Sequence, residues 1–189
     1  MNWLQKICFP ILTDETGQPQ TFYHGTDNKF DQFEKRPGMR YVLFSQFPVE
    51  TQGHYFTDEE EKARLYGRNI MKRQLNVDKL LLDPKKYPHM GVDRFPPELE
   101  EELRYILAPM IQESESGKYM EIGVHTMPVR DDDWIYEAIY STGLHWDVLD
   151  NPEVVKRMKE LGYDGAYVRE DEGSSVFVLD NKQIIPVGK

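Results

Sequence analysis

The 189-residue sequence has a single cysteine, Cys8. One thiol excludes an internal disulfide framework and any zinc site built on several cysteines, and it fits a reducing compartment. The five histidines form no H-x-x-x-H or H-x-H pair, so we expect no histidine zinc site. The acidic triplet 131–133 lacks the further oxygen ligands of a calcium loop, and we interpret it as the acidic start of a helix. The sequence therefore predicts no resident metal.

Long apolar runs and positive charge are also scarce. No run of about 18 apolar residues occurs, so the sequence predicts no membrane-spanning helix. Residues 1–12 lack the charged segment and long apolar core of a secretory signal. With 23 Lys and Arg against 33 Asp and Glu, the net charge is −10, which disfavours binding to nucleic acid. We expect a cytoplasmic protein, in its own cell or in a host cell, that works without membrane contact.

Three common nucleotide and hydrolase motifs are missing as well. The sequence contains no G-x-x-x-x-G-K-[ST], no G-x-S-x-G and no G-x-G-x-x-G. If the chain binds a dinucleotide, it does not do so in the Rossmann manner.

The residues that are present predict one α+β domain over residues 1–189. Hydrophobic residues make up 39% and aromatic residues 12%, enough to build a core. Thr57 and Glu60 form a capping box for a helix that ends near Tyr66. Further helices are expected at 97–112, 133–141 and 151–161. Strands are expected at 21–24, 41–44, about 73–83, 165–168, 175–180 and 184–187. The short spacing of the last strands favours a mainly antiparallel sheet.

The middle of the sequence is the least regular part. Prolines at positions 84, 88, 96 and 97 predict a surface excursion over 84–97. Residues of about 84–150 match no pattern that we can place, and we treat them as an insertion-like region of unknown role.

Three groups of residues are candidates for chemistry. His24, Gly25 and Thr26 follow a strand and offer a ring nitrogen, an approachable backbone and a hydroxyl. Tyr55 and Tyr66 are 11 positions apart, a spacing that suits two rings on either side of a flat heterocycle. A basic group can reach a diphosphate; its members are Lys62, Arg64, Arg68, Lys72 and Arg73. Each group also has a structural alternative: a strand end, two core-edge tyrosines, and a solvated helix face paired with Glu59 and Glu60.

Together these segments resemble the ADP-ribosyltransferase superfamily, in its diphtheria-toxin and poly(ADP-ribose)-polymerase branch with a His-Tyr-Glu signature. The matching segments are 23–26 (YHGT), 53–57 (GHYFT) with Tyr66, 161–165 (LGYDG) and 176–184 (VFVLDNKQI). They are most similar to small members from phages and mobile elements. The resemblance implies split antiparallel β-sheets with flanking helices, and NAD as substrate without a metal.

The resemblance also implies roles for individual residues. His24 hydrogen-bonds a ribose hydroxyl of NAD, the Gly25 backbone holds the nicotinamide carboxamide, and Thr26 lies against the ribose. Tyr55 and Tyr66 stack on the nicotinamide ring. Phe56 and Arg64 complete the expected NAD-binding set.

Two positions depart from the family pattern. Ser175 stands where the family has its catalytic glutamate, so Asp171 or Glu172 on the preceding turn is the expected acid. The alternatives are substrate-assisted transfer, no transfer, or a solvated hairpin tip. Ala63 replaces a serine or threonine that would bind the carboxamide.

The expected function is NAD-dependent mono-ADP-ribosylation of a protein acceptor with release of nicotinamide, in a phage or mobile-element enzyme that modifies its host or counters defence. Alternatives are a non-catalytic module that binds ADP-ribose or a protein, an acidic protein-binding inhibitor, ADP-ribosylation of nucleic acid, and transfer of a tRNA 2′-phosphate. The acidic balance of the chain disfavours the last two.

Overall fold

In the computed structural model, residues 11–30, 32–34, 37–42, 45–87, 94–122, 125–129, 134–142, 146–170 and 173–187 are described. The strands are β1 (Phe22–Thr26), β2 (Pro37–Val42), β3 (Ser45–Glu50), β4 (His54–Thr57), β5 (Asn69–Leu75), β6 (Leu80–Leu81), β7 (Ile111–Ser114), β8 (Gly117–Ile122), β9 (His125–Pro128), β10 (Gly165–Glu170), β11 (Gly173–Val178) and β12 (Ile184–Pro186). The α-helices are α1 (Glu60–Ala63), α2 (Pro97–Leu107), α3 (Trp134–Thr142), α4 (Trp146–Leu149) and α5 (Pro152–Glu160). The 3₁₀ turns are η1 (Arg64–Tyr66), η2 (Ala108–Met110) and η3 (Asn181–Gln183). The predicted α+β class is confirmed.

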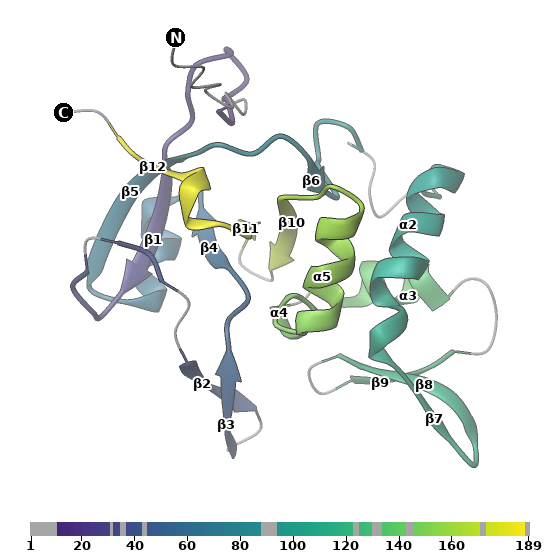
Figure 1. Cartoon of the computed structure of the whole chain (residues 1–189). Helices are drawn as coiled ribbons and strands as arrows, with labels where there is room; N and C mark the ends of the chain where they lie inside the picture. The colour runs from purple at the N-terminus through teal and green to yellow at the C-terminus, as the bar shows by residue number, and fades with distance from the viewer. Residues whose placement is uncertain are drawn as a thin grey trace, which may run out of the picture.

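A seven-stranded sheet in the order β12-β5-β1-β4-β11-β10-β6 forms the centre of the molecule (Figure 1). All its pairs are antiparallel except β10 with β6. Strands β1 and β4 are paired at one position, Tyr23 opposite Thr57, whereas β1 pairs with β5 at five. The sheet therefore divides between β1 and β4, in agreement with the split sheet that the family resemblance implies.

The last three strands occupy both halves of this sheet. β10 and β11 form a hairpin near the middle of Figure 1, while β12 pairs with β5 at one edge of the sheet. The chain turns between them through η3, where Asp180 accepts a hydrogen bond from Lys182 N (2.9 Å) and Gln183 Oε1 accepts one from Asp180 N (2.7 Å). This capped turn connects β11, in one half of the sheet, to β12, in the other half.

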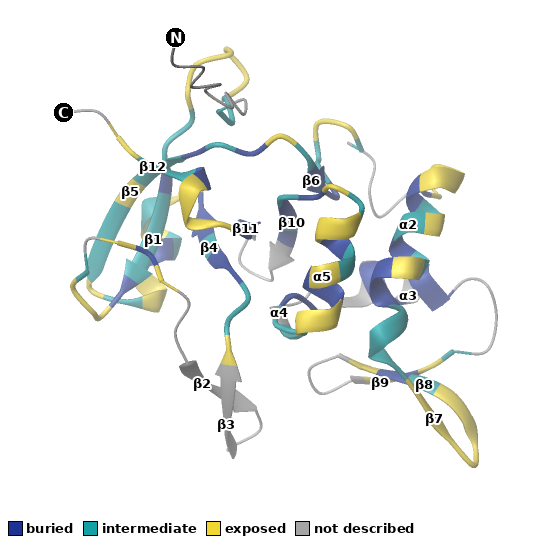
Figure 2. Cartoon of the chain, viewed as in Figure 1, coloured by how far each residue is buried: buried dark blue, intermediate teal, exposed yellow. Residues whose placement is uncertain are grey.

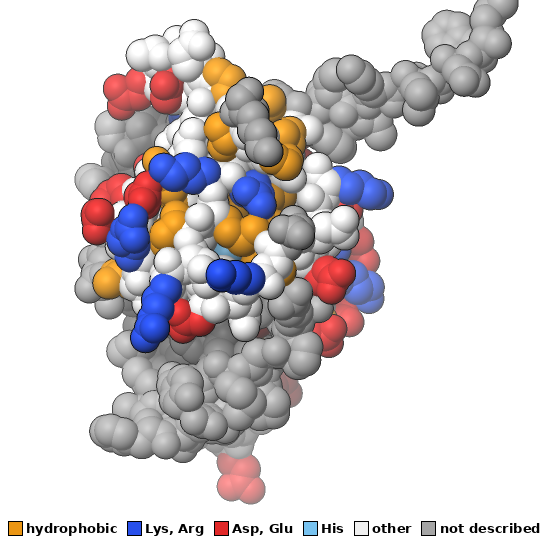
Figure 3. Space-filling model, turned by 90° about the vertical axis from the view of Figure 1, so that its left-hand side faces the viewer, with side chains coloured by type: hydrophobic (Ala, Val, Ile, Leu, Met, Phe, Trp, Pro, Cys, Tyr) orange, Lys and Arg blue, Asp and Glu red, His pale blue; other side chains and the backbone are white. Residues whose placement is uncertain are grey.

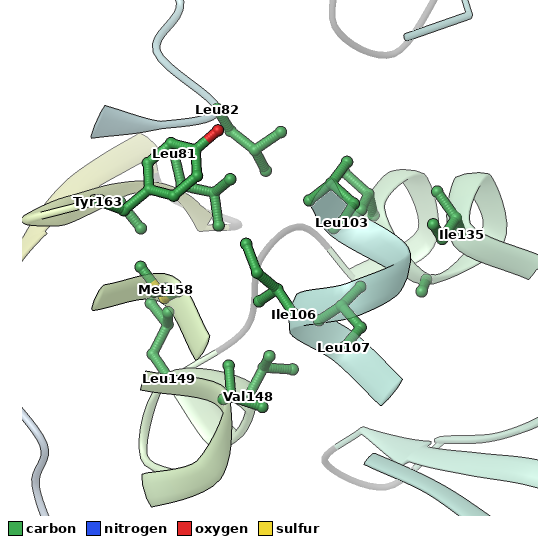
Figure 4. Close-up of a cluster of buried hydrophobic side chains, with 14 of the residues drawn as sticks. Leu81, Leu82, Leu103, Ile106, Leu107, Ile135, Val148, Leu149, Met158 and Tyr163 are labelled. Carbon is green, nitrogen blue, oxygen red and sulfur yellow. The ribbon is translucent and has the colours of Figure 1, made fainter. Parts of the chain in front are cut away.

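The two faces of the sheet cover two separate hydrophobic clusters. The larger cluster joins α2, α3, α4 and α5 to β10 and β11. Figure 2 shows buried sides of these helices turned toward one another, and Figure 4 shows the converging side chains. The smaller cluster comprises Phe22, Phe33, Phe56, Leu75, Val77, Leu80, Val176 and Val178. Directly paired residues share a face, so Tyr55, Ser175 and Phe177 face the larger cluster, whereas Phe56 and Val176 face the smaller one.

The middle region contributes to the larger cluster. Leu103 and Ile106 of α2 and Ile135 of α3 are fully buried there. Phe95 is 6% exposed and stacks on Tyr136 with ring centroids 5.1 Å apart, so the prediction of a surface excursion over 84–97 is wrong at this residue. Residues 88–93 of that segment lie outside the described residues.

Helix boundaries follow local chemistry. Asn151 caps α5 by accepting from Glu153 N (2.9 Å), and Gly162 beyond its end has a φ of +78°, as its position predicts. Helix α2 ends at Leu107 and not near residue 112, because Pro109 has no N–H for the helical ladder.

Thr57 does not cap α1. Its backbone belongs to β4, and its Oγ1 accepts from Glu59 N (3.3 Å), so α1 starts at Glu60. The expected strand over about 73–83 is divided into β5 and β6.

Candidate functional site

His24 lies at the division of the sheet, enclosed by aromatic rings. Its ring centroid is 6.1 Å from that of Phe30, 5.1 Å from Phe33 and 5.4 Å from Phe56. We call these three phenylalanines the aromatic cage of His24. The Nδ1 atom is 2.9 Å from the carbonyl oxygen of Tyr55, so β1 and β4 are joined here by a side chain where their backbones have separated.

This contact defines the tautomer of His24. A carbonyl oxygen only accepts, so Nδ1 carries the hydrogen and donates it. Burial within the cage, and then the positive charge of Arg73, lower the pKa of His24 below its ordinary 6.5. At neutral pH the ring is therefore uncharged, and its Nε2 is an acceptor suited to a hydroxyl donor such as a ribose O–H.

Gly25 and Gly67 are required by close packing of α1 and η1 against β1. A Cβ on Gly25 would lie 1.6 Å from the carbonyl oxygen of Ala63. A Cβ on Gly67 would lie 2.1 Å from the backbone carbon of Thr26. Gly25 is therefore needed for the packing of α1 on β1, which the sequence did not indicate. Its backbone contact with the nicotinamide carboxamide stays a prediction. Ala63 itself is 1% exposed, so its methyl group fills this packing.

Thr26 is also occupied locally. Its side chain is buried, and its Oγ1 accepts a hydrogen bond from Asn28 N at 3.1 Å. Its expected position against the ribose stays a prediction.

The two candidate tyrosines have different surroundings. Tyr55 is half-buried against the larger cluster, with its ring centroid 4.8 Å from that of Phe177. Tyr66 is 62% exposed, in the η1 turn that follows α1. By strand register, the Tyr55 ring and the His24 ring lie on opposite faces of the sheet, although the Tyr55 backbone binds His24.

Most of the basic group is paired with the acidic start of α1. Lys62 Nζ lies 2.6 Å from Glu59, Arg64 Nη2 lies 2.5 Å from Glu60, and Lys72 Nζ lies 2.9 Å from Glu60. The side chain of Arg64 is about half exposed. These contacts are those of the solvated helix face that the sequence allowed, and the proposed contact of Arg64 with a diphosphate stays a prediction.

Ser175, which the resemblance places at the position of the family's catalytic acid, is buried. Ser175 is 5% exposed and lies between Thr57 on β4 and Val168 on β10, on the face that bears Tyr55. The two acids expected to replace the glutamate, Asp171 and Glu172, lie outside the described residues. Their assignment stays a prediction.

Two features of the site were missed from the sequence. Phe30 and Phe33 close the cage over His24 from the segment after β1; their F-x-x-F spacing behind the H-G-T motif was the available signal. His54 is buried and its Nε2 lies 2.8 Å from Asn181 Oδ1, which fastens β4 to η3.

Neither a metal centre nor a membrane span is found in the parts of the chain that the structure describes. No three His, Cys, Asp or Glu side chains there gather in a geometry that would hold a metal ion. None of the described helices is long and apolar enough to cross a membrane.

Comparison with protein families shows to which family the chain belongs. A family model described as ADP-ribosyltransferase in polyvalent proteins matches residues 14–187. The chain belongs to this ADP-ribosyltransferase family. The match extends across the middle region as well as the motif strands, and ADP-ribosyltransferases use NAD as their substrate.

Other comparisons add little. A solved structure titled "Crystal structure of an anti-CRISPR protein" aligns with 87% of this chain and 91% of its own, at 12% identity and a TM-score of 0.45. This similarity is too distant to transfer a function. A comparison with curated proteins finds no significant match.

Proposed function

We propose that this chain is an NAD-dependent mono-ADP-ribosyltransferase that transfers ADP-ribose to a protein acceptor and releases nicotinamide. The observation that carries the proposal is the neutral His24, whose Nδ1 is held by the Tyr55 carbonyl so that Nε2 remains an acceptor. A ribose hydroxyl can donate to such an acceptor, and members of this family use NAD, which carries ribose hydroxyls, as their substrate.

The reaction needs two events at the ribose carbon that bears nicotinamide. The bond to the nicotinamide nitrogen breaks, and its electron pair leaves with the neutral nicotinamide. A nucleophile of the acceptor then bonds to the same carbon and gives its proton to a nearby carboxylate or to water. Positive charge on the ribose between these events is stabilised by a nearby carboxylate. We assign this role to Asp171 or Glu172.

The acceptor is proposed to be a protein. The chain carries a net charge of −10, which repels a polyphosphate acceptor, and Lys62, Arg64 and Lys72 are bound to carboxylates and form no open basic face. The resemblance to phage and mobile-element members adds the proposal that the acceptor protein belongs to a host cell.

Release of nicotinamide from NAD by the purified chain tests the activity. Tyr66→Ala is a clean variant for the stacking role, because Tyr66 is 62% exposed and supports no core. The matched control is Tyr105→Ala, which removes another exposed tyrosine far along the chain on α2. We expect the first variant to lose up to about tenfold in rate, the scale of a lost stacking contact, and the control to keep its rate.

Asp171→Asn and Glu172→Gln then separate the two candidate acids. Loss of nicotinamide release in one of them identifies the acid. If both variants release nicotinamide as fast as the unaltered chain, the assignment of the acid to this turn is wrong.

A second candidate function is a non-catalytic module that binds ADP-ribose. The burial of Ser175 at the usual position of the acid favours it, because a serine supplies no negative charge. This module would be stabilised thermally by ADP-ribose while leaving NAD intact.

A further inference from the structure

The structure distributes the basic group between the two faces of the sheet. On β5, Lys72 lies opposite Tyr23 and Arg73 lies opposite Phe22. Successive strand residues point to opposite faces, so these two cations are separated by the sheet. Lys72 joins Glu60 and the ring of Tyr23 on the side of α1, whereas Arg73 shares the side of Phe22 and His24.

Arg73 extends over the aromatic cage of His24. Its guanidinium carbon is 5.6 Å from the centroid of the Phe33 ring, and the same ring is 5.1 Å from His24. Its Nη1 donates to the carbonyl oxygen of Lys72 at 2.7 Å, which orients the guanidinium. The charge of Arg73 also acts on His24, since it helps to lower the pKa of that ring. Figure 3 shows basic side chains set among hydrophobic ones, with histidine surface between them, on the side of the molecule where β1 and β5 lie.

This juxtaposition matches the chemistry of a ribose joined to a phosphate. A neutral imidazole accepts from a ribose hydroxyl, and a guanidinium bonds phosphate oxygens through several parallel N–H donors. The two groups act on each other, because the charge of Arg73 adds to burial in lowering the pKa of His24 and so helps its Nε2 to remain an acceptor. Arg64, Lys62 and Lys72 meet carboxylates on the other face and are not placed beside His24.

We infer that Arg73 binds the diphosphate of NAD, next to the ribose that His24 holds, and that it is a residue that determines affinity for the ADP-ribose part of the substrate. This inference rests on the proposed function. It replaces Arg64 with Arg73 as the basic residue of the dinucleotide site.

Calorimetric titration of the full chain with ADP-ribose and, separately, with nicotinamide tests the inference. Arg73→Gln is compared with Lys72→Gln, which removes the same charge from the next residue of the same strand on the opposite face. We expect Arg73→Gln to weaken ADP-ribose binding by roughly ten- to a hundredfold, the scale of a lost charge-assisted contact. Nicotinamide, which has no phosphate, should bind both variants as it binds the unaltered chain.

Two further measurements separate binding from folding. The pKa of His24, followed by NMR, should rise in Arg73→Gln and stay constant in Lys72→Gln, a shift that a purely structural arginine far from the ring would not produce. Should Arg73→Gln fail to fold, Arg73→Lys keeps the charge but loses the planar fork, and it should bind ADP-ribose with intermediate affinity.

The contrary outcomes are distinct. If the folded Arg73→Gln or Arg73→Lys binds ADP-ribose as tightly as the unaltered chain, or if Lys72→Gln weakens it equally, the assignment of Arg73 is wrong while the proposed function stands. If the unaltered chain binds neither ADP-ribose nor NAD and releases no nicotinamide, both proposals are overturned.

Discussion

The larger and the smaller hydrophobic cluster differ in composition and in what they hold. The larger cluster is mostly aliphatic and draws on α2, α3, α4 and α5, with residues such as Leu103, Ile106 and Leu149 fully buried. The smaller cluster is rich in phenylalanine, draws on β1, β4, β5 and β11, and carries His24 at its edge. The sheet divides between β1 and β4, next to the smaller cluster.

We interpret this difference as a division of roles, in which the larger cluster stabilises the fold and the smaller cluster orients His24. His24 and its aromatic cage lie with the smaller cluster, while the middle region supplies most residues of the larger cluster. A large aliphatic core can hold a sheet rigid, and a small aromatic cluster at the division of that sheet can then keep one histidine neutral and oriented. Substitutions that act on one cluster and not the other test whether this separation is real.

The largest effect is expected from Leu103→Ala in the larger cluster. Leu103 is fully buried, and removing a buried leucine side chain costs about 2–5 kcal/mol in free energy of unfolding. Urea unfolding measures the loss, with hydrogen exchange of β10 and β11 as a second probe. The matched control is Leu65→Ala, because Leu65 is 66% exposed and should cost less than about 0.5 kcal/mol.

The same experiment tests how the middle region is joined to the sheet. We expect α2 and the β10–β11 hairpin to lose protection in one transition. A variant that unfolds α2 while β10 and β11 remain protected would contradict a shared core.

A somewhat smaller effect is expected from Gly25→Ala at the division of the sheet. The added methyl group would collide with the Ala63 carbonyl oxygen, and forced overpacking costs about 1–3 kcal/mol. Thermal unfolding measures the loss. Lys62→Ala alters α1 without this collision and should change the melting temperature little. A Gly25→Ala variant as stable as the unaltered chain would show that α1 is not packed against β1 in this way.

Acidification should act through the smaller cluster. The pKa of His24 is lowered in the folded chain, whereas an unfolded histidine takes up its proton near pH 6.5. Between these two values the unfolded state binds more protons, so the free energy of unfolding falls as the pH drops below about 6.5 and the fall ends below the folded pKa. Urea unfolding at several pH values checks this.

His24→Gln removes the titrating group and provides the comparison. This variant should lose part of the pH dependence below about 6.5. An identical pH dependence in both proteins would show that His24 is not held neutral by its cage.

The smallest effect is expected from Arg64→Ala. Arg64 is about half exposed and paired with Glu60, and such surface pairs contribute little, so we expect the melting temperature to change by less than about 2 °C. Affinity for ADP-ribose should be unchanged as well, in contrast to Arg73→Gln. A strong loss of ADP-ribose binding in Arg64→Ala would restore Arg64 as the basic residue of the site.

The features that could be predicted from the sequence are those with local causes. Asn151, Pro152 and Gly162 define both ends of α5 through capping and backbone conformation, which depend on neighbouring residues alone. The strand that leads into His24, Gly25 and Thr26 also agrees with the prediction, and the divided, mainly antiparallel sheet agrees with what the family resemblance implies.

The features that escaped prediction depend on contacts distant in the sequence. Thr57 looks like a helix cap, but its pairing with Ser175 and Tyr23 keeps it in a strand. Which of Lys72 and Arg73 shares a face with His24 depends on the register of β1 with β5, which no local pattern encodes. The same holds for Phe95, whose burial requires the packing of α3.

The most direct test of the central claim is mass spectrometry of a cell lysate incubated with the chain and NAD, beside a sample with Tyr66→Ala. We predict that one or a few proteins gain the mass of ADP-ribose, that nicotinamide is released in step, and that both signals are lost or strongly reduced in the variant. Intact NAD and no modified protein, although ADP-ribose stabilises the chain, would contradict transfer and show that the fold serves binding alone.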